Sequence, residues 1–339
     1  MSFAGAPLSW LYGVGVALRN RRYDEDPTAS VKLPAPVASV GNLTVGGSGK
    51  TPFVAALARE LLARGDPVAV LSRGYGRRSK STFVLVSDGK AVLASAEDCG
   101  DEPLELARAV SGAAVAVGPD RAAAGREVLE RLGPRVLVLD DGFQHRRLRR
   151  DLDLVCFDAG EPLESLQLLP RGRLREPLES LSRAHAVVWT RWSEDAPTEE
   201  LRRLVVRAAP ELPSIRARNH VTGFARLDGS GTLGAESFRD QPVGVLLGVA
   251  RPERVLESIP ARIVFRATRR DHYWWDPAEV RELADEAARK GAVALLTTGK
   301  DAVKMEVAGL PLPLYAVRIE AEILDRSSFE SLLSRLPRP

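Results

Sequence analysis

The sequence predicts an α/β protein whose main domain is a P-loop NTPase-like, doubly wound parallel sheet, joined by an extended ribbon to a second, smaller α/β domain. Three observations predict this fold. Strand-like and helix-like segments alternate along the first two thirds of the chain. A glycine-rich turn ending in Gly49-Lys50-Thr51 lies between a strand and a helix. A later apolar strand ends in the aspartate pair Asp140 and Asp141.

Four segments follow from this pattern: an amino-terminal helix over 1–24, a P-loop domain over 25–212, a ribbon over 213–228 and the smaller α/β domain over 229–339. Short apolar runs bounded by turn residues predict the strands, and longer periodic segments predict the helices. The expected strands of both domains are 37–41, 68–71, 82–87 at an edge, 113–117, 136–140, 152–158, 186–189, 243–247, 262–265 and 293–296. The expected helices are 52–64, one opening at 101, 121–132, 252–259 and 277–290.

Length and composition narrow the class of protein. A chain of 339 residues with 45% hydrophobic content can form two packed domains. The net charge of +3 fits a nucleic acid, an anionic membrane or a phosphorylated substrate, and does not choose among them. Cys99 and Cys156 are too few for a disulfide framework or a cysteine-based metal cluster, so a reducing cytosol is expected.

The amino terminus carries an apolar run, Pro7 to Leu18, followed at once by Arg19, Arg21 and Arg22. The run is too short to span a bilayer, which takes about 20 residues. It also lacks the positive region that precedes the apolar core of a secretory signal. Two interpretations stay open: a helix lying in the membrane interface, with the arginines near anionic lipid, or a helix packed on the domain.

The stretch Val37 to Pro52 predicts a phosphate-binding loop between a buried strand and a helix. Glycines let backbone N–H groups surround a phosphate, and the helix start adds its positive dipole end. Lys50 is placed to reach the β- and γ-phosphates, and Thr51 to hold Mg²⁺. Thr44 replaces the usual first glycine, and the alternative is an ordinary strand-to-helix turn. We assign the loop to Thr44, Val45, Gly46, Gly47, Ser48, Gly49, Lys50 and Thr51.

The four apolar residues before Asp140 describe a buried parallel strand with carboxylates at its carboxyl end. A metal-holding aspartate of a P-loop protein lies in this position, beside the hydroxyl of Thr51. Which of Asp140 and Asp141 would contact the metal cannot be decided from the pattern. The alternative is a pair of exposed turn aspartates.

Further polar segments are candidates for substrate binding or proton transfer. Asp101 and Glu102 open a helix, where carboxylates often only complement the dipole, but a carboxylate facing the γ-phosphate can also activate a hydroxyl. Arg73 and Arg121 lie in positions that suit an anion, although a solvated loop explains the first equally well. His272, between an aspartate and aromatic residues, also fits a packed loop.

Several segments, in this order, resemble the tetraacyldisaccharide 4′-kinase family, the lipid A 4′-kinases of Gram-negative bacteria. The resemblance covers nearly the whole chain, and the segment around Asp140 together with the Thr44 variant of the loop is its most specific part. The matching segments are Pro7–Tyr12, Val40–Pro52, Leu71–Gly76, Gly100–Pro103, Val117–Arg121, Leu139–His145, Leu169–Pro177, Asp271–Tyr273 and Thr297–Lys304.

The resemblance implies phosphorylation of the 4′-hydroxyl of a tetraacylated glucosamine disaccharide 1-phosphate, with ATP and Mg²⁺, at the cytoplasmic face of the inner membrane. It implies that Asp101 is the base, supported by His272. We add Lys50 and Asp141 as catalytic residues and Glu102 as a metal ligand with Thr51 and Asp140. The residues assigned to the substrate are Arg73, Arg121, Gln144, His145 and Arg171.

The expected partners are the acylated lipid substrate and the membrane surface, with no nucleic acid and no obligate protein partner. Gly299 stands where the family leads us to expect an acidic residue, and Leu247–Ala250 replaces a more polar turn. A P-loop ATPase or GTPase switch acting on a protein or nucleic acid is the alternative. A guanine-reading Asn-Lys-x-Asp motif is missing from the expected place, and aromatic residues are not interleaved with the arginine runs.

Overall fold

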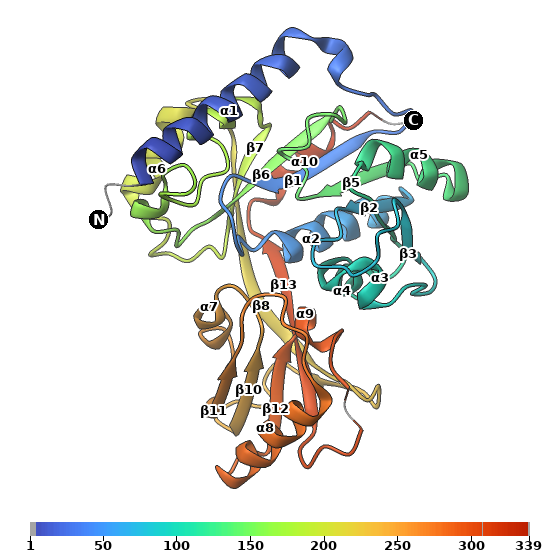
Figure 1. Cartoon of the computed structure of the whole chain (residues 1–339), viewed down its shortest axis with the longest axis vertical. Coiled ribbons are helices and arrows are strands. Elements are labelled where there is room, and N and C mark those ends of the chain that lie inside the picture. The colour runs from blue at the N-terminus through green and yellow to red at the C-terminus, as the bar shows by residue number, and fades with distance from the viewer. Residues whose placement is uncertain (1–4, 307, 338–339) are drawn as a thin grey trace.

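The structure is a computed structural model that describes residues 5–306 and 308–337. Residues 1–4 of the expected amino-terminal helix and residues 307, 338 and 339 of the expected second domain lie outside these ranges. Twelve of the strands follow one another across a single continuous sheet, in the order β11-β10-β12-β13-β8-β7-β6-β1-β5-β2-β4-β3, and β9 pairs with β8. Figure 1 shows two lobes that share this sheet. The predicted α/β class with a parallel P-loop sheet is therefore confirmed.

The first lobe contains the parallel sheet that the alternating pattern predicts. Apart from the antiparallel edge strand at Val84–Asp88, its strands are parallel, predominantly apolar and buried, as strands covered by helices on both faces must be. The strands are β1 (Val37–Asn42), β2 (Val68–Ser72), β3 (Val84–Asp88), β4 (Ala114–Val117), β5 (Val136–Asp140), β6 (Leu152–Asp158) and β7 (Ala186–Thr190). The helices are α2 (Lys50–Ala63), α3 (Ala96–Cys99), α4 (Asp101–Ala109), α5 (Arg121–Leu132) and α6 (Glu199–Ala208), with 3₁₀ turns at Pro27–Ala29, Leu163–Ser165 and Leu178–Arg183.

The second lobe contains the smaller part of this sheet and has helices of its own, drawn in orange and brown in Figure 1. Its strands are parallel to one another and end toward the first lobe, so the loops after them face the phosphate loop. The elements are β10 (Pro242–Leu247), α7 (Pro252–Leu256), β11 (Arg262–Thr268), α8 (Pro277–Arg289), β12 (Ala294–Thr298) and α9 (Gly299–Ala302).

The connection between the lobes differs from the expected single ribbon. β8 (Ser214–Arg226) pairs with β7 at its start and with β13 (Leu314–Ile323) antiparallel along most of its length, and its far end also pairs with β9 (Thr232–Gly234). After β13 the chain re-enters the first lobe as α10 (Arg326–Leu333), where Phe329 packs edge-on against Phe53 of α2 at 6.0 Å. The expected domain over 229–339 therefore does not describe α10, which belongs to the core of the first lobe.

Helix α1 (Gly5–Glu25) packs on the first lobe by one face only. Tyr12 donates to the carbonyl of Arg175 at 2.9 Å, and Arg19 pairs with the buried Glu176 at 2.7 Å. The opposite face leaves large apolar side chains in solvent, namely Leu8, Trp10, Leu11, Val14 and Leu18. Among the described helices, none is both long enough and apolar enough to cross a bilayer.

Candidate active site

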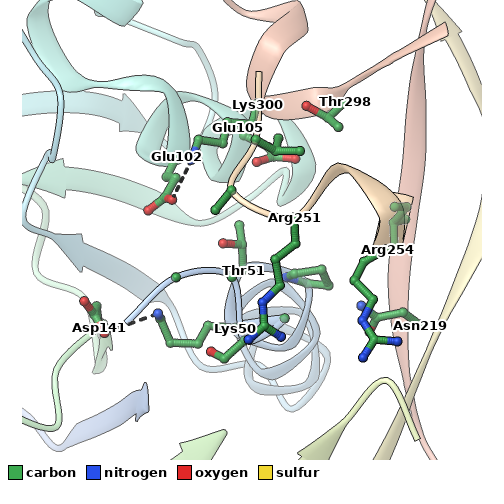
Figure 2. A pocket seen from close by; sticks show the side chains of 18 of the residues that line it. Lys50, Thr51, Glu102, Glu105, Asp141, Asn219, Arg251, Arg254, Thr298 and Lys300 are labelled. Carbon is green, nitrogen blue, oxygen red and sulfur yellow. Dashed lines mark hydrogen bonds and ion pairs between the residues drawn. The ribbon is translucent and has the colours of Figure 1, made fainter. Parts of the chain in front are cut away.

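A cavity of about 980 Å³ lies between the lobes, where the carboxyl ends of the first lobe's strands meet the loops of the second lobe. Ligands bind at this edge in doubly wound folds. The phosphate loop, the start of α4 and the end of β5 line one side. The segments at Val249–Arg254, Asp271–His272 and Thr298–Lys300 line the other (Figure 2).

The phosphate loop has the backbone that anion binding requires. Gly49 takes the left-handed conformation, with φ of 70°, directly before α2. Within residues 5–306 and 308–337, no oxygen accepts a hydrogen bond from the N–H groups of residues 46–49. Lys50 at the start of α2 lies 3.3 Å from Asp141 and 3.2 Å from Asn42 Oδ1 (Figure 2). The loop therefore presents unpaired donors and a lysine to the cavity.

The carboxylates at the end of β5 have opposite electrostatic surroundings. Burial, followed by the charge of Glu102, raises the pKa of Asp140, whose oxygen accepts a hydrogen bond from Ser72 at 3.0 Å. Burial also opposes ionisation of Asp141, but Lys50 and Arg175 outweigh it and lower its pKa to about 2. Asp141 has φ of 54°, a strained conformation for a residue other than glycine. The charge of Asp141 is therefore balanced by cations of the protein, whereas Asp140 lacks such a balance.

The residues predicted to hold Mg²⁺ supply a suitable but incomplete set of ligands. Thr51, Glu102 and Asp140 offer the hard oxygen atoms that Mg²⁺ prefers, and all three line the same cavity. The described residues contain no group of three or more histidine, cysteine or acidic side chains placed to hold a metal. Mg²⁺ commonly takes one or two carboxylates together with phosphate and water, so the set fits it as a nucleotide-bound ion.

Asp101 and His272 form a hydrogen-bonded pair across the two lobes. His272 Nδ1 lies 2.9 and 3.0 Å from the two carboxylate oxygens of Asp101, and Lys304 donates to Oδ2 at 2.8 Å. Although burial opposes it, the hydrogen bond from His272 and the charges of Lys300 and Lys304 hold the pKa of Asp101 well below its usual value. His272 lines the cavity, with φ of 57°, and Asp101 is buried behind it.

A second contact between the lobes, from Lys300 to Glu102, lies beside the Asp101–His272 pair. Lys300 donates to Glu102 at 3.2 Å (Figure 2) and also to Asp271 at 2.8 Å. Burial opposes the charge of Lys300, but the three carboxylates around it raise its pKa. The predicted residues Asp101 and Glu102 are therefore brought together with His272, which is distant in sequence; Glu102 and His272 line the cavity, and Asp101 lies behind them.

The predicted substrate residues divide into two groups. Arg73 and Gln144 line the cavity. Arg121 is buried and donates to the carbonyl of Pro119, and His145 is also outside the cavity wall. The side chain of Arg171 is exposed and its backbone N–H donates to Ser9 of α1, so the structure does not bring it to the site. Within the same arginine run, Arg175 reaches the cavity instead and contacts Asp141 at 2.7 Å.

Comparison with known proteins agrees with this geometry. The family model described as tetraacyldisaccharide-1-P 4′-kinase matches residues 1–338. The chain belongs to this family. It is 41% identical to the tetraacyldisaccharide 4′-kinase of Geobacter sulfurreducens, with 96% of this chain and 91% of that protein covered. It is 40% identical to that of Geobacter metallireducens, with 98% and 97% covered.

A solved structure of the same family has the same fold. The LpxK protein of Aquifex aeolicus, crystallised in complex with ATP, superposes with a TM-score of 0.76 at 31% identity, covering 97% of both chains. The family resemblance carried by the phosphate loop and the Asp140 segment is therefore confirmed. The roles of individual residues stay predictions.

Several charged residues that line the cavity were not predicted from the sequence. Glu105 follows Glu102 by one helical turn, and burial with the nearby charge of Glu102 raises its pKa to about 8. A side chain at Gly299 would meet Glu105, since an added Cβ would lie 2.5 Å from Oε1. A larger residue at this position would therefore require the side chain of Glu105 to move. Arg191 and Arg251 also line the cavity, and no motif or spacing pointed to them.

Proposed function

We propose that this protein is an ATP-dependent kinase that phosphorylates the 4′-hydroxyl of the tetraacylated glucosamine disaccharide 1-phosphate precursor of lipid A. The observation that carries the proposal is that one cavity joins a phosphate loop with free N–H groups to the Asp101–His272 pair. The first feature suits a nucleoside triphosphate, and the second suits a hydroxyl that must lose a proton. We infer the identity of the acceptor from the names of the relatives of this chain.

The transfer needs little covalent chemistry from the protein, because phosphoryl transfer mainly requires positioning and charge stabilisation. The 4′-oxygen attacks the γ-phosphorus, the bond from that phosphorus to the bridging oxygen of ADP breaks, and the hydroxyl proton passes to the Asp101–His272 pair. We assign Asp101 as the base and His272 as the residue that orients it. Because His272 Nδ1 and Lys304 already contact Asp101, the incoming hydroxyl must displace one of these contacts.

The remaining charges stabilise the triphosphate. Lys50 exchanges its contact with Asp141 for the γ-phosphate, and Arg73 and Gln144 bind the acceptor from the cavity wall. Mg²⁺ bound by Thr51, Asp140 and Glu102 would neutralise charge on the transferring phosphate. The pKa of Asp140, raised by burial and then by the charge of Glu102, supports this assignment, because a bound divalent cation would favour the ionised carboxylate.

We further infer that α1 places the protein on the cytoplasmic face of the inner membrane. Its inner face lines the cavity through Tyr12 and Arg19, while Trp10, Leu11 and Leu18 on the outer face are 68%, 58% and 64% exposed. Exposed apolar side chains beside Arg21 and Arg22 suit the interface of an anionic membrane. An acylated acceptor could then enter the cavity while its chains stay in lipid.

Phosphate transfer from ATP to the acylated disaccharide 1-phosphate in detergent micelles tests the kinase proposal. We expect a product phosphorylated at the 4′ position and ADP formation that depends on the acceptor. ADP formation at the same rate without the acceptor, and no phosphorylated lipid, would favour the ATPase alternative.

Sedimentation with phosphatidylethanolamine–phosphatidylglycerol vesicles tests the role of α1. The double variant Leu11→Glu/Leu18→Glu places charges on the exposed face and disturbs no core contact, so we expect it to stay in the supernatant. Val206 of α6 is exposed to a similar extent, so Val206→Glu is the matched control and should sediment like the unmodified protein. Equal sedimentation of all three proteins would contradict the α1 assignment.

A further inference from the structure

Behind the phosphate loop lies a second charge cluster, which we call the loop-side cluster: Asp158, Glu161, Arg173, Arg191 and Arg251. Asp158 ends β6 and Glu161 follows it, and both side chains are 1% exposed. Arg191 contacts Asp158 at 2.6 Å, and Arg173 contacts Glu161 at 2.9 Å. Three guanidinium groups against two carboxylates leave a net positive charge beside the loop.

Two of these arginines hold carbonyl groups of the phosphate loop itself. Arg191 donates to the carbonyl of Gly47 at 3.0 Å, and Arg173 donates to that of Val45. In a planar trans peptide the carbonyl and the following N–H point to opposite sides. Fixing these two carbonyls on the outer side of the loop therefore turns the N–H groups of Gly46 and Ser48 toward its inner side, where a phosphate binds.

Two arginines of the second lobe reach this segment: Arg254 of α7 donates to the carbonyl of Gly160 at 2.9 Å, and Arg251 contacts the two carboxylates. Arg251, in the loop before α7, donates to Asp158 at 2.8 Å and to Glu161 at 2.7 Å and so bridges both carboxylates. Figure 2 shows its side chain extending from the second lobe toward the start of α2. A single arginine that satisfies two buried carboxylates fixes their separation, and with it the separation of Arg191 and Arg173.

We infer that Asp158, Glu161 and Arg251 are positioning residues that preorganise the phosphate loop for ATP, and that this arrangement is complete only when the second lobe is docked. The inference rests on the proposed kinase function and names a control on its nucleotide site. None of the three residues needs to touch the nucleotide, because each acts through Arg173 or Arg191. Docking of the second lobe thereby raises affinity for ATP as well as delivering His272.

Asp158→Asn separates this inference from simple charge effects, because the two predict opposite signs. Removing a carboxylate near an anion site should tighten ATP binding if long-range electrostatics alone acted. Loss of positioning should weaken it, since an amide cannot hold two guanidinium groups as a carboxylate does. We expect Asp158→Asn and Arg251→Ala each to raise the dissociation constant for ATP about tenfold.

The measurement is titration calorimetry of the full chain with ATP in Mg²⁺ buffer, which needs no lipid acceptor and so stands even if the acceptor is misassigned. Kinase assays should show a raised KM for ATP and a kcat within about twofold at saturating ATP. The double variant should bind ATP little more weakly than either single one. Arg326→Ala, which removes an exposed pair with Glu60 of α2, is the control and should bind ATP normally.

Unchanged or tighter ATP binding by Asp158→Asn would overturn the inference. A weakened Arg251→Ala with an unaffected Asp158→Asn would also overturn it, because Arg251 would then bind the nucleotide directly. A lower kcat with an unchanged KM for ATP in these variants would likewise overturn the inference. If Arg251→Ala does not fold, Arg251→Lys with Asp158→Asn decides in the same way, because lysine keeps the charge and cannot bridge both carboxylates.

Discussion

Two charge clusters join the lobes, and they differ in kind. The acceptor-side cluster, made of Asp101, Glu102, His272, Lys300 and Lys304, combines carboxylates with a histidine and lysines, groups that can exchange protons or partners. The loop-side cluster, Asp158, Glu161, Arg173, Arg191 and Arg251, pairs carboxylates only with arginines, whose charge and fork geometry are fixed. Both clusters take their carboxylates from the first lobe. The acceptor-side cluster takes its cations from the second lobe, whereas the loop-side cluster takes only Arg251 from it and has Arg173 and Arg191 from the first lobe. With the roles proposed above, one contact between the lobes serves the chemistry and the other serves the geometry of the phosphate loop.

The largest effect should come from the acceptor-side cluster. Asp101→Ala and His272→Ala should each lower kcat by about 10²- to 10⁴-fold, because each removes part of one proton-accepting unit, with little change in the KM for ATP. The double variant should be little worse than Asp101→Ala. Steady-state kinetics of the three variants make the test. Fully multiplicative losses would show that His272 acts independently, and a normal kcat in Asp101→Ala would move the base role to Asp140 or Asp141.

The phosphate loop contacts the loop-side cluster and shares the cavity with the acceptor-side cluster. The loss of activity in its variants is therefore the reference for both clusters. Lys50→Ala and Thr51→Ala should each lower turnover by at least about 10²-fold, through lost charge stabilisation and a lost metal ligand respectively. The same kinase assay measures them. Activity near that of the unmodified protein in either variant would contradict the phosphate-loop assignment, and with it the meaning given to the loop-side cluster.

Lys304 tests whether the acceptor-side cluster also stabilises the protein. Its side chain is 1% exposed, so Lys304→Met leaves the buried Asp101 with one cation fewer. Breaking a buried pair from one side should lower the free energy of unfolding by about 3 kcal/mol. Chemical denaturation measures this loss. Arg203→Met, which breaks an exposed pair with Glu199, is the control and should change it by less than about 0.5 kcal/mol. Equal effects in the two variants would remove the claim that the Lys304 pair is buried and structural.

The smallest effect concerns His145, which belongs to neither cluster. Burial, together with the charge of Arg121, lowers its pKa from 6.5 to about 4. The unfolded chain therefore binds a proton more readily as the pH falls below about 6.5, and stability is lost between there and pH 4. By pH 5 the loss should reach about 2 kcal/mol. His145→Asn should show a shallower fall in denaturation experiments between pH 7 and 5, whereas parallel curves would contradict this account.

Local chemistry made the phosphate loop and the Asp140 strand predictable, whereas the Asp101–His272 pair of the acceptor-side cluster was predicted from the family resemblance. Glycines before Gly49-Lys50-Thr51 and an apolar strand ending in Asp140 carry their function in their spacing, and the fold class follows from the same elements. The loop-side cluster has no such signal, because Asp158 and Arg191 follow two different strands of the first lobe and Arg251 reaches them from the second lobe. In the Leu169–Pro177 run, sequence could not tell which arginine faces the cavity, since a turn exposes Arg171 while the extended part directs Arg175 inward.

The carboxyl-terminal elements were missed although a signal existed. Val317, Ile319, Ala321 and Ile323 alternate with charged residues, which is the period of a half-buried strand, and β13 follows this pattern. What the pattern could not give is the destination of the chain after β13. That destination depends on the pairing of β13 with β8 across about 100 intervening residues, a long-range contact that no local preference determines.

The return of the chain through β13 and α10 has a consequence for synthesis. Phe329, Leu332, Leu333 and Leu336 complete the apolar layer that covers Phe53 and its neighbours on α2. A ribosome delivers α2 before the second lobe and α10 after it. The first lobe therefore cannot close its core until α10 has emerged. The second lobe, whose strands β10, β11 and β12 are encoded together, is free to form while the first lobe still waits.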